Sequence, residues 1–126
     1  MNEIVLEFPL PAEPLSMNDK DNRSTGRDKQ AWRDTAYYRW VEAHPGQGPA
    51  GRAAPCPAEV HVTIPFPVHR RRDPINYART VKAIVDGLVR AGAWPDDTPD
   101  YVTQHIPTLV EARNLPVLIR ISARRT

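Results

Sequence analysis

The residues of this chain that could do metal and phosphate chemistry gather in one stretch of its second half. They are Asp73, Asn76, Lys82, Asp86, Asp96 and Asp97, preceded by Arg70, Arg71 and Arg72. Converging carboxylates can hold Mg²⁺ ions, which activate a water molecule and stabilise the leaving oxygen when a phosphodiester is cut. A nearby lysine can stabilise charge on the phosphate, and arginine side chains suit phosphate oxygens because the guanidinium group donates two parallel hydrogen bonds. One interpretation of these residue types is a metal-dependent site that acts on a nucleic-acid backbone.

A structural interpretation of the same residues stays open. Asp73 followed by Pro74 is typical of a helix start, with the aspartate as cap and the proline in the first turn. Lys82 and Asp86 are four residues apart, so on a helix they share a face and could form an exposed ion pair worth only about 0–1 kcal/mol. The adjacent acidic pair lies in a proline-flanked turn and could serve that turn alone.

Length and composition place the chain among small single-domain proteins. Its 126 residues suit one hydrophobic core, and no run of about 18 apolar residues predicts a membrane span. The N-terminal stretch has acidic residues and no basic leader, and Cys56 has no cysteine partner for an internal disulfide. We therefore expect a cytoplasmic protein. Residues 64–126 carry 10 Lys or Arg against 6 Asp or Glu, an excess that suits either solubility or a phosphate-bearing partner.

The strands that must position these residues follow from the apolar pattern. Strand-like stretches occur at residues 3–10, 58–66, 101–110 and 115–122. Pro107 indicates that the third stretch is an edge strand or is broken there, because proline cannot donate to a sheet. The long polar loop 11–26 follows the first strand, and its Lys20 and Arg23 are candidate contacts for phosphate.

The helices follow from apolar residues at helical spacing. Such spacing occurs at residues 27–43 and 77–91. Ser24 or Thr25 could cap the first helix, and Gly92 lies where the second would end. A connection rich in proline and glycine, 44–57, is expected to be flexible. The order strand, helix, strand, helix, strand, strand predicts an α+β or α/β domain over residues 1–126. Of these we take α+β: a mixed sheet of about four strands covered by two helices.

Several of these stretches, in this order, resemble the RusA family of Holliday-junction resolvases, endonucleases that nick four-way DNA junctions. EFPLPAEPLSMN is similar to the family's N-terminal signature, and RRRD, then Asn, Lys and Asp-Gly-Leu, then AGAWPDD, is similar to its central motif. The resemblance covers most of the chain. It implies a RusA-like fold and a homodimer that uses Mg²⁺, with Mn²⁺ as a substitute. Its partners would be branched DNA and four-way junctions in a bacterial or phage-infected cell. No membrane and no nucleotide cofactor are expected.

The resemblance also implies roles for individual residues. Asp73 corresponds to the first aspartate of the family's Asp-x-Asp-Asn, Asn76 matches the asparagine, and Asp97 or its neighbour Asp96 matches the later acid. Lys82 resembles the motif lysine, and Asp86, which precedes Gly87 and Leu88, matches an aspartate that is frequent in the family's helix. We therefore expect the catalytic residues to be Asp73, Lys82 and Asp97, and the metal ligands to be Asp73, Asn76, Asp86, Asp96 and Asp97. From their charge and position, the expected DNA contacts are Arg70, Arg71, Arg72, Lys20 and Arg23.

The chain departs from the family's motif at two points. The second aspartate is replaced by Ile75 or Pro74, neither of which binds metal, and the lysine lies nine residues after Asp73, further than the common pattern gives. One carboxylate is therefore missing, or its role has moved to Asn76 or Asp86. The predicted function is a Mg²⁺-dependent endodeoxyribonuclease that resolves Holliday junctions. The alternatives are a branched-DNA-binding protein with weakened or lost cleavage, and a small interaction module with a solvated acidic turn.

The histidines enter this prediction only marginally. The four, at positions 44, 61, 69 and 105, show no zinc-ligand spacing. His69 stands beside the arginines and is expected near phosphate, whereas His61 and His105 are expected to point outward from strands. The prediction depends instead on Asp73 and the acidic pair converging around a divalent cation.

Overall fold

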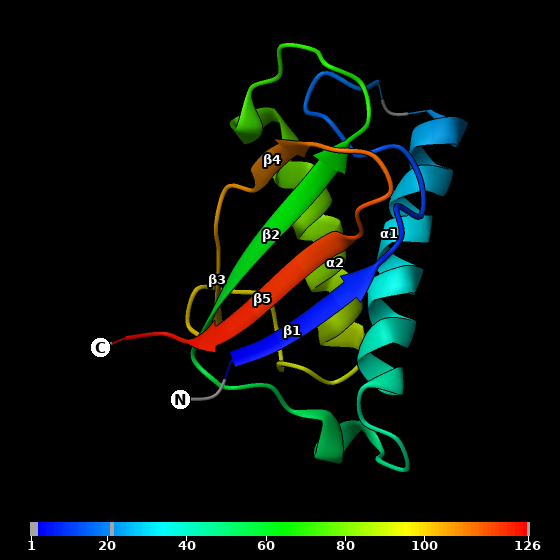
Figure 1. Ribbon diagram of the computed structural model, residues 1–126. Coiled ribbons are helices and arrows are strands. Elements are labelled where there is room, and N and C mark those ends of the chain that lie inside the picture. The colour runs from blue at the N-terminus through cyan, green and yellow to red at the C-terminus, as the bar shows by residue number, and fades with distance from the viewer. Residues whose placement is uncertain (1–2, 21, 126) are drawn as a thin grey trace.

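The computed structural model describes residues 3–20 and 22–125, which form one mixed sheet with two helices on one of its faces (Figure 1). The strands are β1 Glu3–Phe8, β2 Ala58–Phe66, β3 Val102–Gln104, β4 Thr108–Glu111 and β5 Val117–Ala123. The helices are α1 Arg23–Glu42 and α2 Ala78–Arg90, and two short 3₁₀ turns are η1 Pro49–Arg52 and η2 Pro74–Tyr77. The predicted α+β class is confirmed, with five strands in place of about four.

The extra strand arises from the break expected at Pro107. The sheet has the order β1-β5-β2-β3, and β4 also pairs with β2. β5 lies antiparallel to β1 and β2, whereas β3 and β4 lie parallel to β2, one after the other along its length. Residues 105–107 interrupt that edge, since the ring of Pro107 leaves no backbone N–H for the ladder.

The hydrophobic core fills the space between the sheet and the helices. Its fully buried side chains include Leu6, Val60, Ile64, Ile119 and Ile121 from the strands, Trp32 and Trp40 from α1, and Val81, Ile84 and Leu88 from α2. The two helices expected from the spacing of apolar residues are therefore confirmed. The other face of the sheet has no helix over it in Figure 1. Neither α1 nor α2, within the part of the chain described, has the length and apolarity that crossing a bilayer requires.

The first helix begins earlier than the apolar spacing predicts. It starts at Arg23, and the cap is Asn22, whose Oδ1 accepts a hydrogen bond from the backbone N–H of Thr25 at 2.9 Å. The predicted caps, Ser24 and Thr25, are wrong because both lie inside the first turn. Thr25 is buried and its hydroxyl donates to the carbonyl of Lys20 at 2.6 Å. Because the first turn is polar and contains a glycine, which is a poor helix former, the apolar pattern does not show that the helix begins there.

The connection at 44–57 is tied to the ends of both helices. Its 3₁₀ turn ends at Arg52, which is buried and donates from Nε to the carbonyl of Ala91 at 2.8 Å. Trp40 of α1 donates from Nε1 to the carbonyl of Arg52 at 2.7 Å. These contacts anchor the middle of the connection, and its flexibility stays a prediction.

Candidate active site

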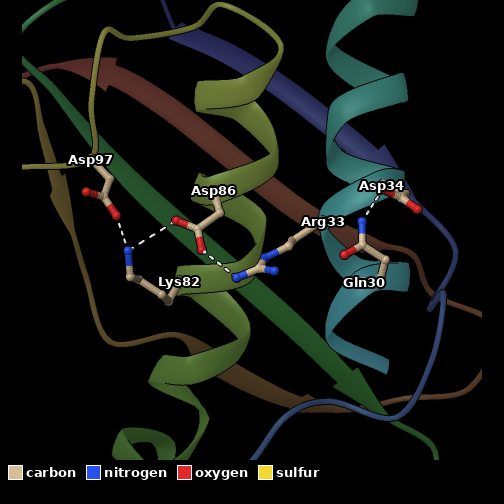
Figure 2. A network of polar contacts seen from close by, with 6 residues as sticks. All are labelled: Gln30, Arg33, Asp34, Lys82, Asp86 and Asp97. Carbon is tan, nitrogen blue, oxygen red and sulfur yellow. Dashed lines mark hydrogen bonds and ion pairs between the residues drawn. The ribbon is translucent and has the colours of Figure 1, made fainter. Parts of the chain in front are cut away.

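Lys82 lies between two aspartates that come from different parts of the chain (Figure 2). Its Nζ donates to Oδ1 of Asp86, one turn further along α2, at 3.1 Å. It also contacts Oδ2 of Asp97, in the loop that follows α2. From α1, Arg33 brings Nη2 to within 3.4 Å of the other oxygen of Asp86. A row of alternating charges therefore crosses from α1 over α2 to the loop.

Gly87 explains how Arg33 comes so close to Asp86. A Cβ atom at position 87 would lie 2.2 Å from the carbonyl oxygen of Arg33 and 3.0 Å from Cβ of Ala36, so only glycine permits this approach of the helices. The Asp-Gly pair at 86–87 thus combines a charged residue with the contact point of α1 and α2. The Nε atom of Arg33 is buried and has no hydrogen-bond partner among the described residues.

Gly92 and Trp94 turn the chain back toward α2. Gly92 has a φ of 103°, and a Cβ atom there would lie 2.7 Å from the carbonyl oxygen of Pro49, so the turn needs glycine. Trp94 is 3% exposed, and its Nε1 donates to the carbonyl of Pro55 at 2.9 Å. Because this tryptophan is held in the core, the acidic pair that follows it is directed along the helix surface.

The two acids of that pair have different contacts. Asp97 faces Lys82, whereas Oδ1 of Asp96 accepts a hydrogen bond from the backbone N–H of Asp97 at 2.7 Å. The hydrogen bond from Lys82 lowers the pKa of Asp97, and the same bond raises the pKa of Lys82 against the opposing effect of burial. Both groups are therefore charged at neutral pH. In this arrangement Asp96 makes a turn contact, and its role as a ligand stays a prediction.

Asp73 and Asn76 line a hollow of about 510 Å³ beside the start of α2. Its acidic lining residues are Glu13, Asp19, Asp28 and Asp73, and its arginines are Arg70, Arg71 and Arg72. Asp73 also caps η2, since its Oδ1 accepts from the backbone N–H of Ile75 at 3.3 Å. The sequence identified one of these four acids. The other three lie in or beside the long polar loop. They are far from Asp73 in the sequence, so the sequence does not show that they lie near it in the fold.

The long loop is fastened to the start of α2, which accounts for the hollow. The backbone N–H of Met17 donates to the carbonyl of Asn76 at 2.7 Å. Leu15 donates from its N–H to the hydroxyl of the fully buried Thr80 at 2.8 Å, and that hydroxyl donates back to the carbonyl of Leu15 at 2.9 Å. The loop that the sequence leaves without a partner is thus one wall of a polar hollow.

The predicted DNA contacts lie at or beside this hollow. Arg72 is held, with its Cζ 4.0 Å from the centre of the Phe66 ring and its Nη1 donating to a backbone carbonyl at 3.0 Å. Arg70 and Arg71 are exposed, and so are Lys20 and Arg23, which flank the helix cap. Their contact with DNA stays a prediction.

The structure brings the predicted site residues together in two groups. Lys82, Asp86 and Asp97 form one, whereas Asp73 and Asn76 lie in the hollow, which none of the first group lines. Across residues 3–20 and 22–125, one set of three His, Cys, Asp or Glu side chains places its ligand atoms within 4.8 Å of one another, and it lies elsewhere. The predicted acids therefore do not supply three oxygens at that spacing, and their roles as metal ligands stay predictions.

That set is Glu59, His61 and His105. Nε2 of His105 lies 2.8 Å from Oε1 of Glu59, and the rings of His61 and His105 stack at 4.1 Å between centroids. Burial and the neighbouring His105 lower the pKa of His61. The outward direction expected for the histidines agrees with an exposed His61 and a partly exposed His105. Spacing could not reveal their contact, because the parallel register of β2 and β3 creates it.

Comparisons with known proteins add no identification. No protein-family model matches the chain, and a search of curated proteins finds no match. The resemblance to the RusA family therefore depends on the quoted motifs.

Proposed function

We propose that this chain is a divalent-metal-dependent endonuclease that nicks four-way DNA junctions, as its resemblance to the RusA family implies. The observation that carries the proposal is the cluster of Lys82, Asp86 and Asp97, which joins one ammonium and two carboxylates. The side chain of Lys82 is 55% exposed and that of Asp97 24%, so a phosphate can reach both. Carboxylate oxygens are the ligands that Mg²⁺ prefers, and Mn²⁺ accepts the same donors.

The carboxylate oxygens of this cluster are donors of the kind that such an ion binds. Asp97 and Asp86 would hold it, with the adjacent Asp96 as a candidate to complete the shell, and it would supply an activated water and charge stabilisation. Asp73 and Asn76 line the separate hollow, and they could join this shell only if the two groups move together. Lys82 forms ion pairs with both carboxylates in the structure, and a bound cation would take its place between them. Lys82 would then be free to donate to an oxygen of the scissile phosphate.

The arginines beside Asp73 supply the expected grip on DNA. Arg70, Arg71 and Arg72 line a polar hollow and are accompanied by the exposed Lys20 and Arg23. Because contacts of this kind release counterions from the phosphate backbone, binding should weaken steeply as salt rises. A four-way junction has two-fold symmetry, so a symmetric dimer with one cluster per subunit would make paired nicks. Such an enzyme would act in the cytoplasm of a bacterial or phage-infected cell.

Cleavage of a synthetic junction tests the proposal. The purified chain should make paired, symmetric nicks in Mg²⁺, and these should disappear in Asp73→Asn and in Asp97→Asn. Asp34→Asn is the matched control, since Asp34 lies on the exposed side of α1, where its carboxylate accepts from Gln30 at 2.7 Å (Figure 2). A junction that stays intact at every Mg²⁺ and Mn²⁺ concentration would contradict cleavage.

Ile75 offers a second test, by gain of activity. The residue is 49% exposed and stands where the family motif has its second aspartate, so a carboxylate there would not be buried. We expect Ile75→Asp to raise the cleavage rate. Ile106→Asp is the control, because Ile106 is 56% exposed and lies in the break between β3 and β4. If Ile75→Asp leaves the rate unchanged, a missing carboxylate does not limit catalysis.

Binding of branched DNA without cleavage is the second candidate function. Two observations favour it: an isoleucine in the metal motif, and an ammonium group that already forms ion pairs with Asp86 and Asp97. A junction that is shifted on a gel but not cut, in Mg²⁺ or Mn²⁺, would select this function. The absence of any salt-sensitive affinity for DNA would exclude both and favour an interaction module.

A further inference from the structure

A second cluster of side chains that could hold a metal ion is Glu59, His61 and His105, which the strands carry on one face of the sheet. The buried neighbours of Glu59 and His61 along β2 face the helices, so the cluster lies on the opposite face, over which Figure 1 shows no helix. Glu59 and His61 alternate along β2, so both point to the same face of the sheet. His105 follows the last residue of β3, and its backbone N–H donates to the carbonyl of Val60 at 3.2 Å, which continues the parallel register. The backbone therefore fixes all three side chains next to one another.

The donors of this cluster suit a borderline transition metal. Two imidazole nitrogens and one carboxylate oxygen lie within 4.8 Å of one another, and Zn²⁺ binds such sets at about 2.0–2.2 Å per ligand. For all three side chains to contact one ion, each must shift by a small amount. Such shifts are possible because the side chains of His105 and Glu59 are only partly buried, with 36% and 28% exposed. Mg²⁺ prefers oxygen donors and is a poor match for two imidazoles.

The charges around the cluster permit a cation. Arg120 on β5 lies opposite His61 in the antiparallel register and would repel one. Its guanidinium group is, however, paired with both carboxylate oxygens of Glu3, at 3.2 and 2.9 Å. Glu59 supplies a negative charge inside the cluster, and its hydrogen bond with His105 at 2.8 Å already aligns two of the three ligands.

We propose that Glu59, His61 and His105 bind one Zn²⁺ ion, or a divalent ion of similar chemistry, with the remaining position open to water or another ligand. The site is separate from the proposed nuclease cluster. It would join β2 to the edge of the sheet just past β3, a strand of only three residues. An ion that binds the folded chain and not the unfolded one stabilises the fold by mass action, so occupancy should raise the melting temperature.

Metal titration of the full chain, without a polyhistidine tag, tests this site. Competition with a chromophoric chelator should give one equivalent of bound Zn²⁺, and Co²⁺ should give the visible absorption of a nitrogen-ligated ion. Both signals should disappear in the double variant His61→Ala, His105→Ala. The matched control is His69→Ala, since His69 also faces a carboxylate, Oε2 of Glu111 at 2.5 Å, but that pair lacks a third ligand among the described residues.

Three further outcomes decide the proposal. Zn²⁺ should raise the melting temperature of the native chain and of His69→Ala, but not of the double variant, whose fold is checked by circular dichroism. Excess Mg²⁺ should not displace the ion, and Asp97→Asn should bind it as the native chain does. Equal Zn²⁺ binding by the native chain and the double variant, or no stoichiometric binding by the native chain, would overturn the site.

Discussion

The two clusters that could hold a cation differ in their donors and in what now neutralises them. Around Lys82, two carboxylates from α2 and the following loop enclose an ammonium that the protein itself supplies. Around His105, two imidazoles and a carboxylate from adjacent strands meet with no lysine or arginine bonded to them in the part of the chain described. To take a metal, the first cluster must give up the two ion pairs of Lys82, while Arg33 stays beside Asp86. The second cluster gives up the one hydrogen bond between Glu59 and His105.

The two clusters should differ in when they bind a metal ion. We expect the carboxylate cluster to take Mg²⁺ weakly in the free protein and better when DNA is present, because the phosphate gives Lys82 a new partner. The histidine cluster needs no substrate, since its ligands are already aligned on a sheet. The two clusters should therefore respond to different metals and to different variants.

Crossed variants give the largest expected effect and test whether the clusters are independent. Asp97→Asn should slow junction cleavage in Mg²⁺ by about a hundredfold or more, the scale on which loss of one electrostatic group slows catalysis, while Zn²⁺ binding is unchanged. His61→Ala with His105→Ala should abolish Zn²⁺ binding and leave cleavage in Mg²⁺ as it is. Cleavage rates and chelator competition, measured on the same preparations, check both. If either variant impairs both properties, the clusters are coupled and the comparison fails.

The two clusters also differ in how much of each the sequence could predict. The Lys82–Asp86 contact follows from a four-residue spacing on a helix, and the helix itself was predicted within one residue at each end. The approach of Asp97 was only an expectation, because it depends on Gly92 and a buried tryptophan turning the chain back. Sequence periodicity describes the inside of an element and says little about where the next loop leads.

The contacts that the sequence missed all depend on how elements are placed against one another. Arg33 reaches Asp86 because Gly87 lets two helices touch, a packing contact with no local signal. His61 and His105 meet because β3 pairs with β2 in parallel at one particular register. The pattern predicts that each histidine points outward, but a shift of one residue in that register would separate them.

Substitution of Gly87 tests whether helix packing positions the carboxylate cluster. Gly87→Ala should lower the free energy of unfolding by about 1–3 kcal/mol, because its Cβ would lie 2.2 Å from the carbonyl oxygen of Arg33 and the helices must separate. Urea denaturation measures this change. Cleavage should fall as Asp86 shifts, whereas Zn²⁺ binding should persist under conditions where the variant is folded.

A second glycine supplies the control for that variant. Gly26 lies in the first turn of α1, and a Cβ atom at this position would project into open space, so Gly26→Ala should be neutral or stabilising by up to about 1 kcal/mol. Equal effects of the two substitutions on stability would show that the helices can adjust to a methyl group at position 87. The position of Asp86 would then need another explanation.

Removal of the ammonium gives the smallest expected effect and a defined dependence on pH. The pKa of Asp97 is lowered by Lys82, so its stabilising contribution is present above the ordinary value of 3.8 and is lost as the pH falls through the lowered value. The pKa of Lys82 is raised by Asp97, so its contribution is present below 10.5 and is lost as the pH rises through the raised value. Lys82→Met should therefore cost about 0–1 kcal/mol between these limits, because the pair is solvent-exposed and screened.

Lys82→Met also tests separately the two roles that we assign to Lys82, which are competition with the metal ion and donation to the scissile phosphate. Without the ammonium, Asp86 and Asp97 repel one another, so Mg²⁺ should bind the free protein more tightly in Lys82→Met than in the native chain, while the cleavage rate falls. Isothermal titration with Mg²⁺ and a cleavage assay at saturating metal measure the two effects separately. A double-mutant cycle with Asp97→Asn, repeated across the pH range and at high salt, isolates the ion pair. Unchanged Mg²⁺ affinity in Lys82→Met would mean that the ammonium does not compete with the metal, and the contrast with the histidine cluster would lose its physical basis.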